Sequence, residues 1–379
     1  MSFDPNIKIG VLGGGQLGRM MIQSAMDYNL DIKSMDPDSN APCKHLVSEF
    51  VHGDITDFDQ VIAFGESCDL ITVEIENVNV DALEALEGKG KKVYPQPRVL
   101  RLIKDKGTQK QFYIDNGIPT SDFVFVDKKS DLANHLHMLP AVNKLRTEGY
   151  DGKGVQVIKS ESDVKKGFEA PSILEQFVDY DKEISVIVAR NAKGEKVAFP
   201  VVELEYHPEA NLVEFLFSPS SLSAEMRTKA KNLAMDVIDK FDMVGLLAVE
   251  MFATKDGRVL VNEVAPRTHN SGHHTIEGNV TSQFEQHLRA ILNLPLGNTD
   301  IVASAVMINL LGHPEHSGVA QYEGVDEAMS YPGMHIHLYG KKETKPFRKM
   351  GHATLVGEDL DELKTRARIF KDRIKIISK

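Results

Sequence analysis

Two glutamates within one short segment could hold a metal ion. Residues 246–266 contain the dipeptide Asp256-Gly257, which predicts a two-residue hairpin turn and places Glu250 directly opposite Glu263. The Cβ atoms of residues paired in this way lie about 5 Å apart on one face, and two carboxylates at that distance repel by about 3 kcal/mol at an effective dielectric of about 20. A shared proton or a hard cation should neutralise them, and Mg²⁺ fits because it takes carboxylates together with phosphate oxygens. A three-residue turn with a bulge would shift this pairing.

A glycine-rich loop after Lys144 could cover phosphate groups. Residues 149–154 contain three glycines between two predicted strands. Their backbone N–H groups and Lys153 could close over phosphates, with Lys144 as a point charge beneath them. An ordinary hairpin turn would also be rich in glycine, so both interpretations remain open.

A second glycine pattern lies near the start of the chain. Gly13, Gly15 and Gly18 form GxGxxG between a predicted strand and a predicted helix, and Asp36 ends the next strand. A dinucleotide-binding fingerprint has this setting, because the backbone approaches a phosphate at the helix N-terminus and the acid meets a ribose. NAD binding, other phosphate binding and a plain tight turn all remain open. The P-loop pattern GxxxxGK[ST] is absent.

A basic cluster near the C-terminus is a further candidate phosphate site. It consists of Lys341, Lys342, Lys345, Arg348 and Lys349, five cations within nine residues. A solvated edge strand would explain such a cluster. In a chain with a formal net charge of −11, a local anchor for a phosphate is an equally open interpretation.

The elements that position these residues fall into three parts. Alternating strands (7–12, 31–36, 70–75, 92–95) and helices (among them 58–64 and 80–86) predict a doubly wound parallel sheet. The middle part is α+β, with helices at 98–116, 128–138 and 223–241, strands at 122–126, 140–145, 155–159, 172–178, 183–190, 196–206 and 211–217, and a hairpin at 245–265. The last part is small and β-rich, with strands near 302–311, 334–339 and 350–356 and a helix at 359–373. We expect domains at 1–97, 98–297 with a central lid at about 120–180, and 298–379.

Composition excludes several classes of protein. The chain has 379 residues, of which 42% are hydrophobic and 26% charged, so it is not disordered. Its acidic balance argues against nucleic acid as a partner. Cys43 and Cys68 cannot form a disulfide framework or a four-cysteine zinc site. No apolar run approaches the ~18 residues of a membrane span and no leader is recognisable, so we expect a cytoplasmic protein without a membrane partner.

Together these features resemble the ATP-grasp superfamily. The segments with the closest similarity are GGGQLGRM (13–20), VEIENV (73–78), DKGTQKQF (105–112), GYDGKG (149–154), EQFV (175–178), NEVAPRTHNSGH (262–273) and PFRKMGH (346–352). They resemble the 5-(carboxyamino)imidazole ribonucleotide synthetases of purine biosynthesis, over essentially the whole chain. The resemblance implies that ATP phosphorylates bicarbonate to carboxyphosphate, and that the amine of 5-aminoimidazole ribonucleotide is then carboxylated. It also implies a homodimer.

The resemblance assigns the ATP site and the catalytic residues by matching motif. ATP would contact Lys106, Lys144, Gly149, Tyr150, Asp151, Gly152, Lys153, Gly154, Glu175, Gln176, Phe177, Val178, Glu183, His207, Asn262 and Glu263. Mg²⁺ would be held by Glu250 and Glu263. Arg267 would stabilise the transferring phosphoryl group, His269 and Asn270 would line the bicarbonate site, and Lys144 would assist catalysis.

The same resemblance assigns the ribonucleotide site. Its residues would be Gln16, Leu17, Glu76, Asn77, Lys342, Arg348 and Lys349. The first glycine loop would then hold the phosphate of this substrate and not a dinucleotide.

Three other functions remain to be distinguished. A formate-using glycinamide ribonucleotide transformylase would share the ATP chemistry. An NAD-dependent dehydrogenase would use GxGxxG and Asp36 but would leave the glutamate pair unexplained. A non-catalytic nucleotide-binding regulator would bind ATP without turnover.

Overall fold

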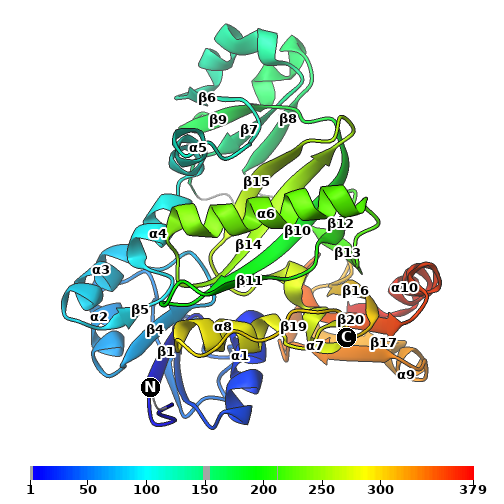
Figure 1. The fold of residues 1–379 in the computed structure, drawn as a ribbon. Helices are drawn as coiled ribbons and strands as arrows, with labels where there is room; N and C mark the ends of the chain where they lie inside the picture. The colour runs from blue at the N-terminus through cyan, green and yellow to red at the C-terminus, as the bar shows by residue number, and fades with distance from the viewer. Residues whose placement is uncertain (1–2, 148–153, 211) are drawn as a thin grey trace.

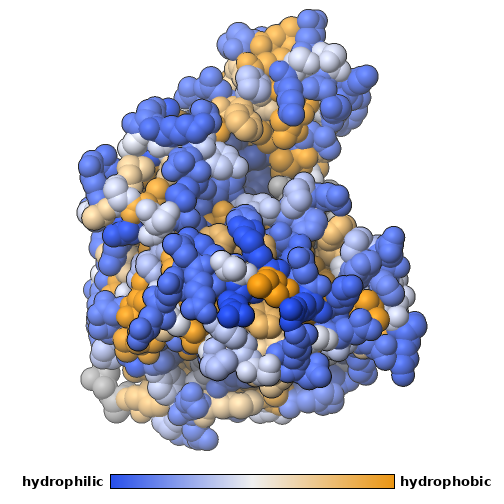
Figure 2. Space-filling view, turned by 90° about the vertical axis from the view of Figure 1, so that its right-hand side faces the viewer, coloured by the Kyte–Doolittle hydropathy of each residue, from blue (hydrophilic) through white to orange (hydrophobic). Residues whose placement is uncertain are grey.

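The computed structural model describes residues 3–147, 154–210 and 212–379. The ribbon shows the N-terminal sheet at the lower left, a lid at the top, and a large central sheet that continues into the C-terminal part at the right (Figure 1). The surface is hollowed between the lid and the body below it (Figure 2).

The N-terminal part is a five-stranded parallel sheet in the order β3-β2-β1-β4-β5. The predicted doubly wound sheet is therefore confirmed. Its elements are β1 (Lys8–Leu12), α1 (Gln16–Asp27), β2 (Asp31–Asp36), β3 (Glu49–His52), α2 (Phe58–Glu66), β4 (Leu70–Val73), α3 (Val80–Gly88) and β5 (Lys92–Val93). The short edge strand β3 was not predicted, because it is only half-buried and lacks a continuous apolar run.

The lid is a four-stranded antiparallel sheet in the order β6-β9-β7-β8. Its elements are β6 (Phe123–Val126), the 3₁₀ helix η1 (Lys129–Met138), β7 (Ala141–Leu145), β8 (Val155–Ile158), the 3₁₀ helix η2 (Glu161–Lys166) and β9 (Ser172–Gln176). The helix expected at 98–116 is in fact two helices, α4 (Pro97–Ile103) and α5 (Lys106–Asp115). The break arises because Asp105 caps α5, accepting hydrogen bonds from the N–H groups of Gly107 and Thr108.

The central sheet has nine strands, eight of them in the order β15-β14-β10-β12-β13-β16-β20-β18, while β11 pairs with β10. Its elements before the C-terminal part are β10 (Tyr180–Arg190), β11 (Lys196–Ala198), β12 (Val202–Tyr206), β13 (Val213–Ser218), α6 (Ala224–Phe241), β14 (Gly245–Thr254) and β15 (Val259–Ala265). Helix α6 covers one face of this sheet, where its buried side chains join those of β10, β14 and β15 in one apolar core (Figure 1).

The hairpin of β14 and β15 has the predicted pairing but not the predicted turn. The hydrogen bond from Thr254 N to Arg258 O, 3.0 Å long, closes a three-residue turn, and Gly257 has a φ of +83°. This turn shifts the register by one residue, so that Met251 faces Val261. A bulge at Asn262 shifts it back, and Glu250 does lie opposite Glu263.

The C-terminal part extends the central sheet and adds a small one. Strands β16 (Ser304–Leu311), β20 (Lys349–Gly357) and β18 (Met334–Leu338) continue the nine-stranded sheet. A three-stranded sheet in the order β19-β17-β21 lies beside it. The remaining elements are η3 (Asn270–Gly272), α7 (Thr275–Gly278), α8 (Gln283–Ile291), β17 (Gly318–Glu323), α9 (Val325–Met329), β19 (Glu343–Thr344), α10 (Leu360–Arg373) and β21 (Lys375–Ser378). Among the described residues, no helix is both long and apolar enough to cross a membrane.

Candidate active site

The paired glutamates of the central hairpin lie where α5 and the lid approach the central sheet. Lys106, at the start of α5, places its Nζ 2.9 Å from Oε2 of Glu263, and this ammonium holds the pKa of Glu263 well below its usual range. On the other side, Tyr206 donates a 3.2 Å hydrogen bond to Glu250. Burial, together with the Glu263 charge, raises the pKa of Glu250 to about 8. Lys106 thus offsets the charge of Glu263, while the raised pKa of Glu250 reflects its burial beside a second carboxylate.

The second predicted lysine reaches the same site from the lid. Nζ of Lys144 on β7 donates to Oδ1 of Asn262 at 3.0 Å and to Oε2 of Glu175 at 3.2 Å. The bulge at Asn262 lets two consecutive residues, Asn262 and Glu263, both contact lysines. The structure thus brings together Lys106, Lys144, Glu250, Asn262 and Glu263.

Most of the predicted phosphate-covering loop cannot be compared with the structure. Gly149, Tyr150, Asp151, Gly152 and Lys153 lie outside the described residues. Gly154 is described, with a φ of +74°, and its carbonyl accepts a 2.9 Å hydrogen bond from Leu145 N.

The predicted adenosine residues divide into buried and exposed members. Glu175 is buried and engaged by Lys144, whereas Gln176 and Phe177 are exposed and, with Val178, line a pocket of about 330 Å³. Glu183 lies on β10 beside the site, and burial raises its pKa.

His207 is engaged by its own loop and by the C-terminal part. Its Nδ1 accepts hydrogen bonds from Glu209 N and Ala210 N, both 3.2 Å long. Its ring packs edge-on against Phe347, with 5.4 Å between the ring centroids. It thus contacts the strand-connecting segment that carries the basic cluster.

Arg267 lies where the N-terminal sheet meets the central sheet. Its guanidinium is 2.9 Å from Oε1 of Glu76 and donates a 2.9 Å hydrogen bond to Thr268 O. Its Nε is buried and has no hydrogen-bond partner among the described residues. A planar donor with a spare N–H group suits an anionic ligand. The ion pair also connects a predicted catalytic residue with a predicted ribonucleotide-binding residue.

His269 and Asn270 are held by buried polar partners. Nδ1 of His269 lies 2.9 Å from the Ser271 hydroxyl and accepts from Ser271 N at 3.3 Å, while its Nε2 is 3.7 Å from Glu250. The Asn270 amide both donates to and accepts from the amide of Asn309, at 2.9 and 2.8 Å. Two hydrogen bonds to Asn309 therefore fix the Asn270 side chain, and the sequence did not predict this contact.

The first glycine loop does not offer all of its N–H groups to a phosphate. Gly14 N donates a 2.6 Å hydrogen bond to Asp36, and Gly18 N donates to the buried carboxylate of Glu74. A Cβ on Gly15 would lie 2.3 Å from Oε1 of Glu74, which explains why glycine is needed there. Two N–H groups of the loop therefore already have carboxylate partners within the chain, and a phosphate would have to bind the remaining ones. Glu74 was missed, although it directly follows the buried strand β4.

The basic cluster faces the N-terminal sheet. Lys342 donates a 2.8 Å hydrogen bond to Asn40, which follows β2. Arg348 closes a turn with Lys345, whose carbonyl accepts from Arg348 N at 3.0 Å. Between them Phe347 has a φ of +59°, a strained conformation for a bulky residue that is typical of functional sites.

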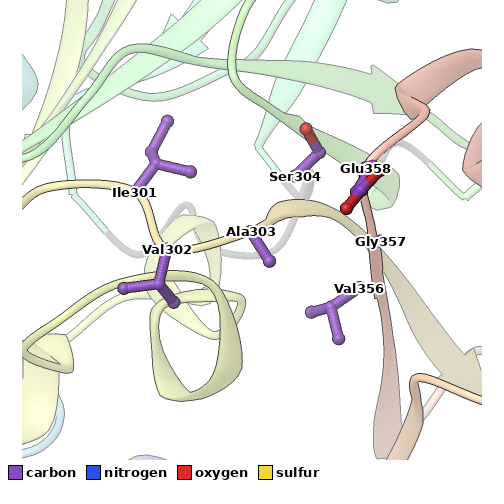
Figure 3. A pocket seen from close by; sticks show the side chains of 7 residues that line it. All are labelled: Ile301, Val302, Ala303, Ser304, Val356, Gly357 and Glu358. Carbon is purple, nitrogen blue, oxygen red and sulfur yellow. The ribbon is translucent and has the colours of Figure 1, made fainter.

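A second hollow in the described part of the chain lies away from these residues. It has a volume of about 460 Å³ and lies at the ends of β16 and β20, where Ile301, Val302, Ala303, Ser304, Val356, Gly357 and Glu358 line it (Figure 3). None of the predicted site residues contributes to it. Four aliphatic side chains, one hydroxyl and a single carboxylate offer no set of groups for phosphoryl chemistry.

Three family models match the chain in succession. A ribonucleotide synthetase pre-ATP-grasp domain matches residues 6–104, an ATP-grasp domain matches residues 111–284, and a phosphoribosylaminoimidazole carboxylase C-terminal domain matches residues 305–366.

Individual relatives agree with these matches. The N5-carboxyaminoimidazole ribonucleotide synthase of Bacillus subtilis is 38% identical over 94% of this chain and 93% of its own length. The chloroplastic phosphoribosylaminoimidazole carboxylase of Vigna aconitifolia is also 38% identical, over 96% of this chain, which spans 66% of that longer protein.

Solved structures of named synthetases share the fold. The N5-carboxyaminoimidazole ribonucleotide synthetase of Thermotoga maritima is similar with a TM-score of 0.91 and 39% identity, covering 98% of this chain and 100% of that one. The synthase of Aspergillus clavatus, in complex with ADP and 5-aminoimidazole ribonucleotide, has a TM-score of 0.88 and 31% identity, covering 97% and 99%. The chain therefore belongs to the family of N5-carboxyaminoimidazole ribonucleotide synthetases, which contain an ATP-grasp domain.

Proposed function

We propose that the chain is an ATP-dependent ligase that carboxylates 5-aminoimidazole ribonucleotide with bicarbonate. The products would be N5-carboxyaminoimidazole ribonucleotide, ADP and phosphate, in purine biosynthesis. The observation that carries this proposal is the convergence of Lys106, Lys144 and the Glu250–Glu263 pair, with Arg267 joined to Glu76 beside them. The Bacillus subtilis and Aspergillus clavatus relatives support the choice of substrate.

The two glutamates fit a magnesium ion. They face one another, Asn262 adds an amide oxygen, and nucleotide phosphates would complete the oxygen ligands that Mg²⁺ prefers. When bound there, Mg²⁺ would neutralise charge on the β- and γ-phosphates. Mg²⁺ there would take over from Lys106 as the partner of Glu263, so that the Lys106 ammonium could contact the nucleotide.

The protein's own residues support two successive bond changes. In the first, an oxygen of bicarbonate attacks the γ-phosphorus of ATP, and ADP leaves. Lys144 and Arg267 offset the charge on the transferring group. In the second, the exocyclic amine attacks the carbon of carboxyphosphate, phosphate leaves, and the amine loses one proton. His269 and Asn270, held by Ser271 and Asn309, would orient the bicarbonate.

The ribonucleotide would lie between the first glycine loop and the basic cluster. Gln16, Leu17, Glu76 and Asn77 are contributed by the N-terminal part, and Lys342, Arg348 and Lys349 by the C-terminal part. The Lys342–Asn40 hydrogen bond supports this placement because it joins the two sides. Since Asp36 and Glu74 occupy two loop N–H groups, the phosphate would rely on the cationic side.

Replacing Arg348 tests this placement. Arg348→Ala should raise the KM for 5-aminoimidazole ribonucleotide by about 10–100-fold while the KM for ATP stays within about twofold, because a phosphate contact is lost from only one substrate. Steady-state ADP release with each substrate varied gives both constants. Arg366→Ala, on α10, is the matched control for loss of a surface arginine. A variant that weakened ATP binding alone would place the cluster in the wrong site.

The remaining proposals concern organisation. Domain limits at 1–97, 98–297 and 298–379 are supported by the three successive family-model matches. A homodimer in the cytoplasm follows from the family resemblance, and light scattering of the purified chain would measure its mass in solution.

A further inference from the structure

A buried lysine outside the predicted site lies behind the ATP-binding residues. Lys110 on α5 has a side chain that is only 2% exposed. Its Nζ donates to the hydroxyls of Thr120 and Ser121 at 2.6 and 2.9 Å, and it is 3.2 Å from Oε2 of Glu175. A fully buried ammonium is rare unless it is paired, so this one calls for a specific role.

The partner of Lys110 is shared with the ATP site. The same oxygen, Oε2 of Glu175, also lies 3.2 Å from Nζ of Lys144 and accepts a 3.0 Å hydrogen bond from Ser121. One buried carboxylate thus joins two lysines, of which only Lys144 also contacts the hairpin, through Asn262. Burial alone would raise the pKa of Glu175, but Lys144 and Lys110 lower it below its usual value, so the carboxylate is ionised.

The charges of this trio explain why two lysines are needed. Lys110, Glu175 and Lys144 sum to one positive charge. If Lys110 were neutral, Glu175 would cancel the charge of Lys144, and the nucleotide phosphates would meet a neutral ion pair. With Lys110 charged, Glu175 can fix Lys144 in position and still leave one net positive charge for the phosphates.

We propose that Lys110 is a positioning residue for nucleotide binding, which balances Glu175 so that Lys144 is held in place without loss of its charge toward phosphate. This inference rests on the proposed function, because it takes Lys144 as a phosphate ligand. Lys110 itself does not touch the nucleotide.

A double-mutant cycle with ADP as the ligand tests the inference. Lys110→Met should weaken ADP binding by about 10–100-fold, because Glu175 then cancels Lys144. Lys110→Met combined with Glu175→Gln restores the net charge of +1, so the double variant should bind ADP at least about fivefold more tightly than Lys110→Met alone, although it lacks the Glu175 contact to Lys144. Isothermal titration measures the dissociation constants without bicarbonate or ribonucleotide. Lys104→Met is the matched control, since Lys104 precedes α5 and donates to Val78 O, not to a carboxylate.

A merely structural role of Lys110 predicts the opposite pattern. The inference would be overturned if the losses of ADP affinity caused by Lys110→Met and by Glu175→Gln simply added in the double variant. It would also be overturned if the double variant bound ADP as weakly as Lys110→Met. Unaltered binding by Lys110→Met would overturn it as well. If Lys110→Met fails to fold, the charge-balanced double variant still decides the matter, because it should fold and bind. A wild-type chain that binds no ADP would overturn the proposed function, and the inference with it.

A pH profile gives a second readout. Burial lowers the pKa of Lys110 to about 8, while the charges that face it are Glu175 on β9, Lys144 on β7 and Lys106 on its own helix. Deprotonation of Lys110 should therefore weaken ADP binding as the pH rises from 7 to 9. The Lys110→Met, Glu175→Gln double variant should lack this step, and a step that persists in it would contradict the assignment to Lys110.

Discussion

Glu263→Gln should lower turnover by about 10³-fold or more, equivalent to roughly 4 kcal/mol of transition-state stabilisation, while the chain stays folded. Glu263 is the charged member of the central pair, held ionised by Lys106 at 2.9 Å. A neutral amide at this position would weaken the binding of Mg²⁺. It would also remove the carboxylate that holds Lys106 in position. Steady-state ADP release at saturating substrates measures the loss.

The control for this variant is another glutamate of the central sheet. Glu205→Gln, on β12, breaks only a surface pair with Arg368 and should leave turnover unchanged. Circular dichroism should show that both variants unfold in one transition near that of the wild type. Glu263→Gln with more than about a tenth of wild-type turnover would contradict the role given to the glutamate pair.

Arg267→Lys should lower kcat by about 10²–10³-fold and leave the KM for ATP nearly unchanged. The lysine keeps the charge but loses the planar set of donors, including the Nε that is unpaired in this state. An interaction that is made mainly in the transition state reduces kcat and kcat/KM equally. The measurement is ADP release over a range of ATP concentrations, with bicarbonate and ribonucleotide saturating.

Arg289→Lys is the matched control for Arg267→Lys. Arg289 also pairs with a glutamate, Glu285, at 2.6 Å, but on α8 and away from the predicted site residues. It should retain wild-type kcat. A raised KM for ATP with an unchanged kcat in Arg267→Lys would show that Arg267 binds the ground state and does not act on the transferring group.

The central hairpin shows how far sequence reasoning reached. The pairing of Glu250 with Glu263 was predicted, yet from an incorrect two-residue turn, and it holds because the three-residue turn and the bulge at Asn262 cancel each other. A bulge inside an apolar strand changes no residue pattern, so periodicity cannot reveal it. The pattern of strand and helix in the first domain was predictable because buried parallel strands are continuous apolar runs.

The residues that the sequence did not reveal share one property. Lys110, Glu74 and Asn309 act on other site residues across separations of 65, 56 and 39 positions, to Glu175, Gly18 and Asn270. Nothing local marks such partners, because their roles arise only when the chain folds. The turn at 345–348 is different. Its sequence, Lys-Pro-Phe-Arg, favours a turn. The sequence does not predict the positive φ of Phe347, because phenylalanine rarely adopts a positive φ.

ADP formation with each of the three substrates omitted in turn tests their identity most directly. Rapid ADP release is expected only when ATP, bicarbonate and 5-aminoimidazole ribonucleotide are all present. Formate with glycinamide ribonucleotide should give little or none, because a site that pairs the bicarbonate hydroxyl is left unsatisfied by formate. Rapid turnover with formate and glycinamide ribonucleotide in bicarbonate-free buffer would contradict the account.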